Sequence, residues 1–427
     1  MSDAGGRGAG AARPGLAGDV GPVRAFLEPR HVAWSERAGA FARQVLAPRA
    51  DAATDQDARV EARALLALMG SAGLFQPIGD RDLRACCLAR EAVAAVSPLA
   101  DAVWALQGLS VTPLLLFGSD AQRARWAGPA LRGELMGAFA ITEPDAGSDV
   151  ASLVTTARRD GDEWVLDGHK HLISNAGIAD FHVVLARSAP DGGSRGITAF
   201  VVPAGTPGLR FAGAQVLSAP HPLGALAFEG CHVPDDHRLG PEGGGFKVAM
   251  ATLDRLRPTV GAAACGMAAR ALDEALAHAL ERRQFGQALA DFQLVRDKLG
   301  RSAIELTAAR LLVYRAAWEK DAGAERITSE AAMAKAFATE AAQRVIDDAV
   351  QILGGRGVLA DGVVDRLYRS IRALRIYEGA TEIQHLIVAG QLIAGAEEAR
   401  RGAGAPTGSA PSTPAARAPG DAGEAGA

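Results

Sequence analysis

Residues 137–149 read Gly137-Ala138-Phe139-Ala140-Ile141-Thr142-Glu143-Pro144-Asp145-Ala146-Gly147-Ser148-Asp149, and the pattern of the chain changes at this stretch. Before it, from His31 to about Arg132, alanine-rich segments carry leucines at three- and four-residue spacing, which is typical of amphipathic helices. After it, short apolar or β-branched runs alternate with turn signals as far as about Gly245, which is typical of strands. The helical period then returns. The sequence therefore predicts the order helical, β, helical.

The middle region contains five short runs that we expect to form strands. The dipeptides Asp160-Gly161 and Asp167-Gly168 are typical of two-residue hairpin turns, whose central positions need positive φ. Hairpin connections favour antiparallel pairing. The expected strands cover residues 154–157, 164–166, 183–185, 198–202 and 225–228.

The C-terminal third is predicted to be a helical bundle. An apolar set between Phe292 and Val313 advances by three and four residues, which places it on one face of a long helix. Comparable helices are expected at about 247–283, 327–353 and 381–395, and long helices with short connections pack as antiparallel bundles. We predict an α+β multidomain protein: a disordered N-terminal segment at 1–30, an all-helical N-terminal domain at 31–137, an antiparallel β-barrel or sandwich middle domain at 138–242, a C-terminal antiparallel four-helix bundle at 243–396, and a disordered tail at 397–427.

Composition excludes several classes of partner. A net charge of −4 over 427 residues gives no basic footprint for nucleic acid or for an anionic membrane. We find no apolar run near the roughly 18 residues of a spanning helix and no apolar signal-peptide core. We therefore expect a cytoplasmic protein without nucleic-acid or membrane partners. The four cysteines have no metal-type spacing and are expected to be buried free thiols.

Residues 375–384, Arg375-Ile376-Tyr377-Glu378-Gly379-Ala380-Thr381-Glu382-Ile383-Gln384, contain the strongest candidate for a catalytic group. Glu378 follows an apolar dipeptide, and a partly desolvated carboxylate has a raised pKa that suits a general base. The glycine after it allows a ligand to approach the backbone. A glutamate before a helix also suits a cap or a partner for the helix macrodipole, and this stretch alone leaves both interpretations open.

Three other features of the sequence bear on ligand binding. The loop at 142–149 offers backbone N–H groups and hydroxyls to a planar or phosphorylated ligand, and 170–175 is a second candidate. His169 and His171 share a strand face but lack a third ligand, so we predict no metal site. The glycine stretches at 243–245 and 354–357 match neither the Rossmann nor the Walker pattern.

Together these stretches resemble the acyl-CoA dehydrogenase family over about residues 31–396. Five motifs occur in the family's order: TEPxAGSD at 142–149, the K-x-W-I-T-N element at 170–175, RxxFG at 282–286, QxxGGxG at 351–357 and IYEG at 376–379.

The resemblance implies an enzyme that uses FAD to oxidise an acyl-CoA to its trans-2-enoyl form. Glu378 would remove the α-proton while the β-hydrogen leaves to the flavin, and the Glu378 N–H with a flavin ribityl hydroxyl would stabilise the enolate. A base just before Arg257, as in some members, is excluded because Leu256 stands there. The implied partners are the acyl-CoA, an electron-transfer flavoprotein and further copies of the chain in a homotetramer.

The same resemblance implies a set of binding residues. The flavin and its phosphates would contact Phe139, Ile141, Thr142, Gly147, Ser148, Leu172, Ile173 and Ser174. The FAD of a neighbouring subunit would contact Arg282, Gln293, Gln351, Gly354 and Gly355, and the cofactor set also includes Phe285, Thr381 and Glu382. The substrate would lie near Ser148, Asp254, Arg257, Tyr377 and Gly379.

Several positions depart from the family pattern. Leu172 replaces an aromatic residue, Ala380 stands where threonine is common, residues 218–224 replace a longer loop, and Gly390 stands where some members place an arginine that meets the CoA nucleotide. Two alternatives therefore stay open: a dehydrogenase for a carrier-protein-bound acyl group, and a flavoprotein with oxygen-using or non-oxidative chemistry. A catalytically silent thioester-binding protein is a third class.

Overall fold

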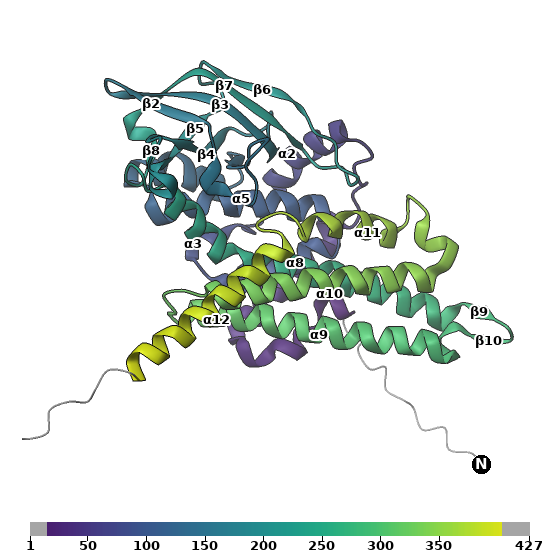
Figure 1. Ribbon diagram of the computed structural model, residues 1–427. Coiled ribbons are helices and arrows are strands. Elements are labelled where there is room, and N and C mark those ends of the chain that lie inside the picture. The colour runs from purple at the N-terminus through teal and green to yellow at the C-terminus, as the bar shows by residue number, and fades with distance from the viewer. Residues whose placement is uncertain (1–14, 404–427) are drawn as a thin grey trace, which may run out of the picture. The chain divides into compact units, whose positions relative to one another are not determined.

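The N-terminal region is helical, as its period predicted (Figure 1). Its second helix is fixed by a capping box, in which Thr54 Oγ1 accepts the Asp57 N–H at 3.1 Å and Asp57 Oδ2 accepts the Thr54 N–H at 3.0 Å. The helices are α1 (Pro29–Phe41), α2 (Asp55–Ser71), α3 (Gln76–Asp80), α4 (Leu83–Ala94), α5 (Pro98–Phe117), α6 (Asp120–Gln122) and α7 (Gly128–Leu131), with π-helical turns η3 (Ala42–Leu46) and η4 (Arg123–Ala127).

The computed structural model describes residues 15–403, and the prediction of disorder was wrong for the parts of the two ends that lie within this range. Residues 15–26 contain the 3₁₀ helices η1 (Leu16–Gly18) and η2 (Gly21–Phe26). The Asp273 carboxylate accepts the N–H groups of Leu16 at 3.0 Å and Ala17 at 3.3 Å. Residues 397–403 belong to a helix. The rest of both predicted segments lies outside the described residues.

Helix α5 is long and apolar enough to pass a composition test for a spanning helix, so the expectation that no such run exists was wrong. The fold gives the reason for its composition, because 78 % of its most apolar 18-residue window is buried inside the protein. The apolar character of α5 is thus that of a core helix.

The middle region is a single eight-stranded sheet with the order β6-β7-β3-β2-β4-β5-β8, and β1 also pairs with β4. Most pairs are antiparallel, but β1 and β2 both run parallel to β4, so the sheet is mixed rather than purely antiparallel. The strands are β1 (Gly137–Ala140), β2 (Thr156–Asp160), β3 (Glu163–Ser174), β4 (Phe181–Arg187), β5 (Ile197–Pro203), β6 (Leu209–Ala214), β7 (Leu223–Pro234) and β8 (Arg238–Leu239).

The two Asp-Gly dipeptides have different structures. Asp160 pairs with Glu163 across a two-residue turn, as predicted. Asp167-Gly168, in contrast, lies inside β3, where the register against β7 shifts and Gly168 has a φ of 145°. A β-bulge next to a glycine therefore produced the same signal as a hairpin.

The C-terminal region is helical. The predicted bundle is present, and a short helix, α11, was missed; it packs against α8 and α10. The elements are α8 (Gly245–Glu281), the β9–β10 hairpin (Arg283–Gln284 and Gln287–Ala288), α9 (Gln293–Asp321), α10 (Thr328–Leu353), α11 (Val363–Leu374) and α12 (Thr381–Ala403). Short 3₁₀ helices complete the chain at η5 (Val150–Ser152), η6 (Gly193–Gly196), η7 (Asp235–His237), η8 (Leu289–Asp291) and η9 (Gly354–Val358). Residues 389–403 continue α12 as a unit separate from the rest.

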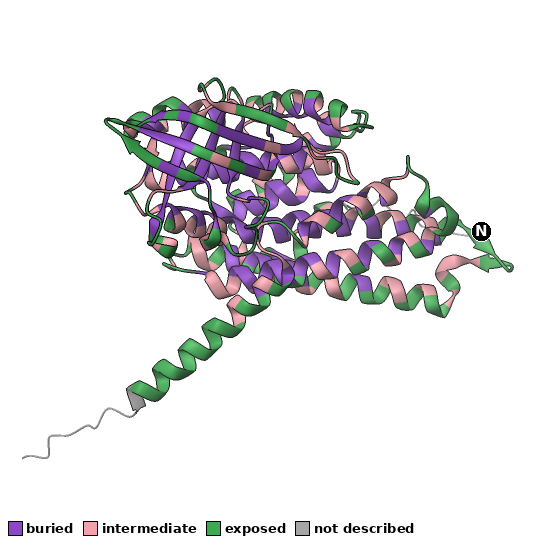
Figure 2. Cartoon of the chain, turned by 45° about the horizontal axis from the view of Figure 1, so that its top comes forward, coloured by how far each residue is buried: buried purple, intermediate pink, exposed green. Residues whose placement is uncertain are grey.

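One continuous core joins the helical regions to one face of the sheet, and a second, smaller core lies within the β region (Figure 2). Alanine supplies much of the helical core, which allows close approach between helix backbones. All four cysteines are buried free thiols, as predicted.

The close approach of α8 and α4 leads to a prediction for Gly266→Ala. A Cβ at this position would lie 2.1 Å from the backbone oxygen of Glu91, so the two helices must separate. We expect a loss of about 1–3 kcal/mol in the free energy of unfolding, measured with urea. Gly39→Ala in α1 is the matched control, because the three nearest atoms there belong to the flexible Arg43 guanidinium. Equal losses in both variants would contradict the explanation.

Candidate active site

Glu378 lies in the connection between α11 and α12, in a backbone conformation that is rare for its residue type. Its φ is 54° and that of Gly379 is 96°, so two successive residues are left-handed. The φ of Gly379 accounts for the glycine, since L side chains rarely adopt it, and a Cβ there would also meet the Gln384 side-chain nitrogen at 2.3 Å. The Thr381 N–H closes the loop by donating to the Arg375 carbonyl at 3.1 Å. The loop thereby directs Glu378 inward.

The Glu378 carboxylate is an unpaired acid in a buried setting. Its Oε2 is buried and has no hydrogen-bond partner among the described residues. It accepts no N–H from the first turn of α12 within this part of the chain, so the interpretation as a helix cap has no support. Burial raises the pKa of Glu378, while the positive charges of Arg90, Lys335 and Arg257 oppose that rise. These are the properties that a general base needs.

The raised pKa has a consequence for stability. Below the ordinary pKa of glutamate the carboxyl is neutral in both the folded and the unfolded chain, whereas above the raised pKa the folded chain holds a buried charge. We therefore expect the thermal midpoint of Glu378→Gln, relative to that of wild type, to be higher at pH 8 than at about pH 5. Scanning calorimetry at both pH values checks this. A difference in midpoint that does not become more favourable between pH 5 and pH 8 would contradict the assignment of a strained, buried acid.

The two stretches predicted to contact the flavin lie side by side. The His171 N–H donates to the Thr142 carbonyl at 2.8 Å, which joins the loop after β1 to β3. Gly147 and Ser148 are exposed on that loop, and Leu172 has a φ of 55° with half of its surface exposed. Ile173, in contrast, points into the β-domain core, so only its backbone is available to a ligand.

A buried ion pair holds these two stretches together. Lys170 Nζ lies 2.7 Å from Glu143 Oε1 and donates to the Ile141 carbonyl at 3.0 Å, and both charged side chains are almost fully buried. The N–H groups of Val154 and Thr155 also donate to the Glu143 carboxylate, at 2.6 and 3.0 Å. Burial lowers the pKa of Lys170 to about 8 despite the opposing effect of Glu143.

A second group of predicted cofactor residues lies at another end of the bundle. Arg282 follows α8, Gln293 begins α9, and Phe285, on the hairpin between them, is 94 % exposed. Gln351, Gly354 and Gly355 lie where α10 ends, and a Cβ on either glycine would meet no atom within 4 Å. Lys335 in α10 contacts the Glu378 loop, because its Nζ donates to the Gly379 carbonyl. Gln351 lies 16 residues further along α10, about 24 Å at 1.5 Å per residue. One chain therefore does not bring this second group to the Glu378 loop.

The remaining predicted residues surround the Glu378 loop but use many of their polar atoms internally. Asp254 forms an ion pair with Arg257 and accepts the Thr328 hydroxyl at 2.8 Å. The Thr381 hydroxyl donates to Glu340 at 2.7 Å. Tyr377 and Glu382 are exposed in part or in full.

Three buried residues near the Glu378 loop were not among the predicted site residues. Lys335 Nζ donates to the Gly379 carbonyl at 2.7 Å, and Gln384 Nε2 donates to the same oxygen at 3.0 Å. Arg90 forms a two-bond ion pair with Asp101 at 2.8 and 2.9 Å. A signal for Lys335 existed, because it shares a helix face with Ala331, Ala338 and Ala342, where only apolar residues are expected.

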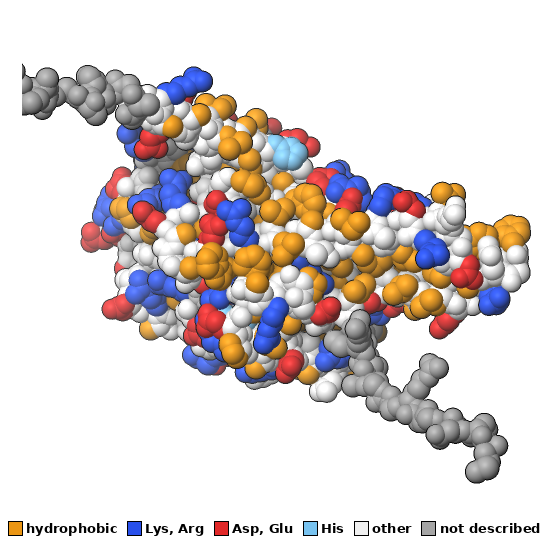
Figure 3. Space-filling view, turned by 90° about the horizontal axis from the view of Figure 1, so that it is seen from below, with side chains coloured by type: hydrophobic (Ala, Val, Ile, Leu, Met, Phe, Trp, Pro, Cys, Tyr) orange, Lys and Arg blue, Asp and Glu red, His pale blue; other side chains and the backbone are white. Residues whose placement is uncertain are grey.

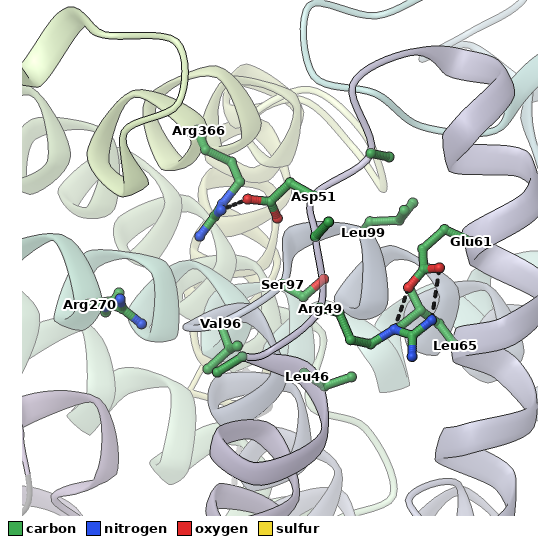
Figure 4. A pocket seen from close by; sticks show the side chains of 13 residues that line it. Leu46, Arg49, Asp51, Glu61, Leu65, Val96, Ser97, Leu99, Arg270 and Arg366 are labelled. Carbon is green, nitrogen blue, oxygen red and sulfur yellow. Dashed lines mark hydrogen bonds and ion pairs between the residues drawn. The ribbon is translucent and has the colours of Figure 1, made fainter.

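Three cavities among the described residues lie apart from Glu378, one of them, about 250 Å³, beside η2 and α1. The one in Figure 4 has a volume of about 80 Å³, and its Arg49 and Arg366 are paired with Glu61 and Asp51. The third, about 760 Å³, is a groove between α9, α10 and α11. Its basic lining residues are Lys298, Arg301, Arg344, Arg369, Arg372 and Arg375. None of the predicted site residues lines any of these cavities.

Family models match almost the whole described chain. The N-terminal, middle and C-terminal domain models of acyl-CoA dehydrogenases match residues 28–134, 138–231 and 243–393. The chain therefore belongs to the acyl-CoA dehydrogenase family, and it is an oxidoreductase that uses FAD.

Individual proteins agree with this assignment. A probable acyl-CoA dehydrogenase of Mycobacterium tuberculosis is 38 % identical over 363 residues, which cover 83 % of this chain and 93 % of the relative. The structure of butyryl-CoA dehydrogenase from Megasphaera elsdenii superposes with a TM-score of 0.80 at 34 % identity, covering 86 % of this chain and 99 % of that one. The FAD complex of PigA gives a TM-score of 0.78 at 29 % identity, with 86 % and 98 % covered.

The residues of this chain fit FAD. The hydroxyls of Thr142 and Ser148 have no hydrogen-bond partner among residues 15–403, and the space around Gly147 is open. The half-exposed Leu172 side chain offers an apolar surface on β3. Free hydroxyls, open backbone and an apolar surface are the groups that a ligand with a planar ring and phosphates requires.

Proposed function

We propose that this chain oxidises an acyl-CoA to the trans-2-enoyl-CoA, with Glu378 as the base that takes the α-proton. The observation that carries the proposal is the buried Glu378 Oε2, which lacks a hydrogen-bond partner within the described chain, while the positive charges of Arg90, Lys335 and Arg257 act on its carboxyl. Such a group is held ready to accept a proton at that oxygen. FAD, once bound, would supply the acceptor for the electron pair that leaves the β-carbon with its hydrogen.

The reaction balances with the acyl-CoA, the Glu378 carboxylate and FAD as its only reactants. The α-carbon loses a proton to Glu378, the β-carbon loses hydrogen with two electrons, and a double bond forms between the two carbons. Charge that develops on the thioester oxygen needs a donor. The Glu378 N–H is a candidate, since it makes no hydrogen bond within the described residues. Arg257 and Lys335 would hold the loop that presents it.

We also propose that the working form is a homotetramer in which one subunit contributes Arg282, Phe285, Gln293 and Gln351 to its neighbour's FAD. The separation of this group from the Glu378 loop supports the idea. Helix α9 supplies a second argument: five residues of its predicted apolar stripe, Val295, Leu299, Leu306, Ala309 and Val313, pack into the core, whereas Ala303 of that stripe is exposed. Hydrophobic side chains also gather on the face of the molecule shown in Figure 3, and α9 carries four large exposed apolar side chains. These side chains are Leu294, Ile304, Leu311 and Trp318. A cytoplasmic location and an electron-transfer flavoprotein as acceptor complete the proposal.

Anaerobic titration of the purified holoenzyme tests the reaction. The panel contains short, branched and aromatic acyl-CoAs and a matching carrier-protein thioester, and the flavin absorbance is followed together with the product. We expect one acyl-CoA class to bleach the flavin and to yield the enoyl product. Bleaching by the carrier-protein thioester alone would transfer the proposal to a carrier-bound substrate. Absence of bleaching by every thioester would contradict dehydrogenation and favour oxygen-using or non-oxidative chemistry.

A further inference from the structure

Lys335 is a buried cation directly under the loop that carries Glu378. It lies in α10, is fully buried, and its Nζ donates to the Gly379 carbonyl at 2.7 Å. A buried ammonium is costly unless it is hydrogen-bonded and faces a counter-charge. The hydrogen bond is present, so the counter-charge has to be identified.

The neighbouring cations already have carboxylate partners. Arg90 is paired with Asp101 and Arg257 with Asp254. Lys335 has no carboxylate within ion-pair distance in the described chain, and Glu378 is the acid that acts on it most strongly. Conversely, Lys335 is one of the three cations that act on Glu378. Glu378 is therefore the acid left to balance Lys335.

The same lysine stabilises an unfavourable backbone. Left-handed φ at Glu378 costs free energy because it is not a glycine. Three side chains hold the two successive carbonyls of this segment: Arg257 Nε donates to Glu378 O at 3.4 Å, while Gln384 and Lys335 donate to Gly379 O. Lys335 makes the shortest of these bonds. It thus acts on both the position and the charge of the base.

We propose that Lys335 is the positioning residue of the base: it fixes the Glu378 loop through the Gly379 carbonyl and serves as the counter-ion of the resting carboxylate. This inference rests on the proposed role of Glu378. When the carboxylate accepts a proton, Lys335 loses its counter-charge, so Lys335 favours the ionised base before the reaction. The other groups that face this region are Arg90, Asp101, Asp254, Arg257, Glu340, Tyr377 and Glu382.

Lys335→Gln separates the two roles, because the amide keeps a donor for Gly379 but removes the charge. The rate of flavin reduction by substrate is measured as a function of pH. We expect the midpoint of this pH profile to shift to higher pH in Lys335→Gln. For each pH unit of that shift, the rate at pH 7 should fall about tenfold. FAD content should stay unchanged. Lys335→Met should also lower the rate of flavin reduction at every pH, because it removes the donor to the Gly379 carbonyl as well as the charge. Lys335→Arg should restore most of the wild-type pH profile of that rate. Lys320→Gln is the control, because Lys320 also donates to backbone carbonyls, those of Ala324 and Glu325.

A second measurement does not depend on the reaction. The change in thermal midpoint caused by Glu378→Gln, measured at pH 7, should be more favourable in the Lys335→Gln background than in the wild type, because the unpaired acid is then more strained. An unchanged pH profile together with an unchanged difference in midpoint would overturn the proposal. If no thioester reduces wild-type flavin, the proposed function fails, and the unfolding cycle still decides whether Lys335 and Glu378 are coupled.

Discussion

Glu378→Gln should retain FAD, but the rate at which an acyl-CoA reduces its flavin should fall by a factor of about 10² to 10⁴. That factor is the usual contribution of a general base. The amide is nearly isosteric and cannot accept the α-proton. The substitution removes the strained charge of Glu378, and this gain offsets the loss of a counter-charge for Lys335. Stopped-flow reduction under anaerobic conditions measures the effect, with the flavin spectrum as the check on cofactor binding.

Glu378→Asp is the matched comparison for this prediction. It keeps the carboxylate but shortens its reach by one methylene, so it should be slower than wild type and faster than Glu378→Gln. A Glu378→Gln variant that is reduced at the wild-type rate would show that another group takes the proton. Asp254 would then be the next candidate, although its carboxylate is already paired with Arg257 and bonded to Thr328.

Lys170→Met should destabilise the protein by about 3–5 kcal/mol, because it leaves the Glu143 carboxylate buried without its cation. The loop after β1 is tied to β3 through this pair, so the variant should also release FAD. Urea unfolding gives the first effect, and the flavin to protein absorbance ratio after gel filtration gives the second.

Two variants control for the Lys170 prediction. Arg210→Met breaks an ion pair with Glu229 in which both side chains are mostly exposed, and it should change stability by less than about 0.5 kcal/mol. Glu143→Gln combined with Lys170→Met removes both charges and should recover part of the loss. Equal effects of Lys170→Met and Arg210→Met would contradict a special role for the buried pair.

Local patterns were sufficient for much of the fold. The change of period at Gly137 separated helices from sheet, and the spacing from Phe292 to Val313 found most of the inner face of α9, although Ala303 of that set is exposed. The Asp167-Gly168 error has a physical cause, since a glycine with positive φ occurs both at this bulge and in a hairpin turn, and only the pairing with β7 distinguishes them. Helix α11 could have been found from Val364, Leu367 and Ile371 on one face.

The site could be located from motifs, but its electrostatics could not. Glu378 stands out in the sequence, whereas the burial of Lys335 and Arg90 depends on contacts across long stretches of chain. Arg90, for example, donates to the Thr259 hydroxyl 169 residues away. The structure of residues 15–26 was missed for the same reason, because the Asp273 carboxylate that accepts the Leu16 N–H lies 257 residues away in the sequence.

The transfer of the α-hydrogen tests the central claim most directly. The holoenzyme is mixed anaerobically with its best acyl-CoA, fully deuterated at the α-carbon, and both the enoyl product and the solvent are analysed after one turnover. The proposed reaction predicts that wild type slows with the deuterated substrate and releases one α-deuterium to water, and that Glu378→Gln releases none. Release of α-deuterium by Glu378→Gln at the wild-type rate would contradict the role of Glu378.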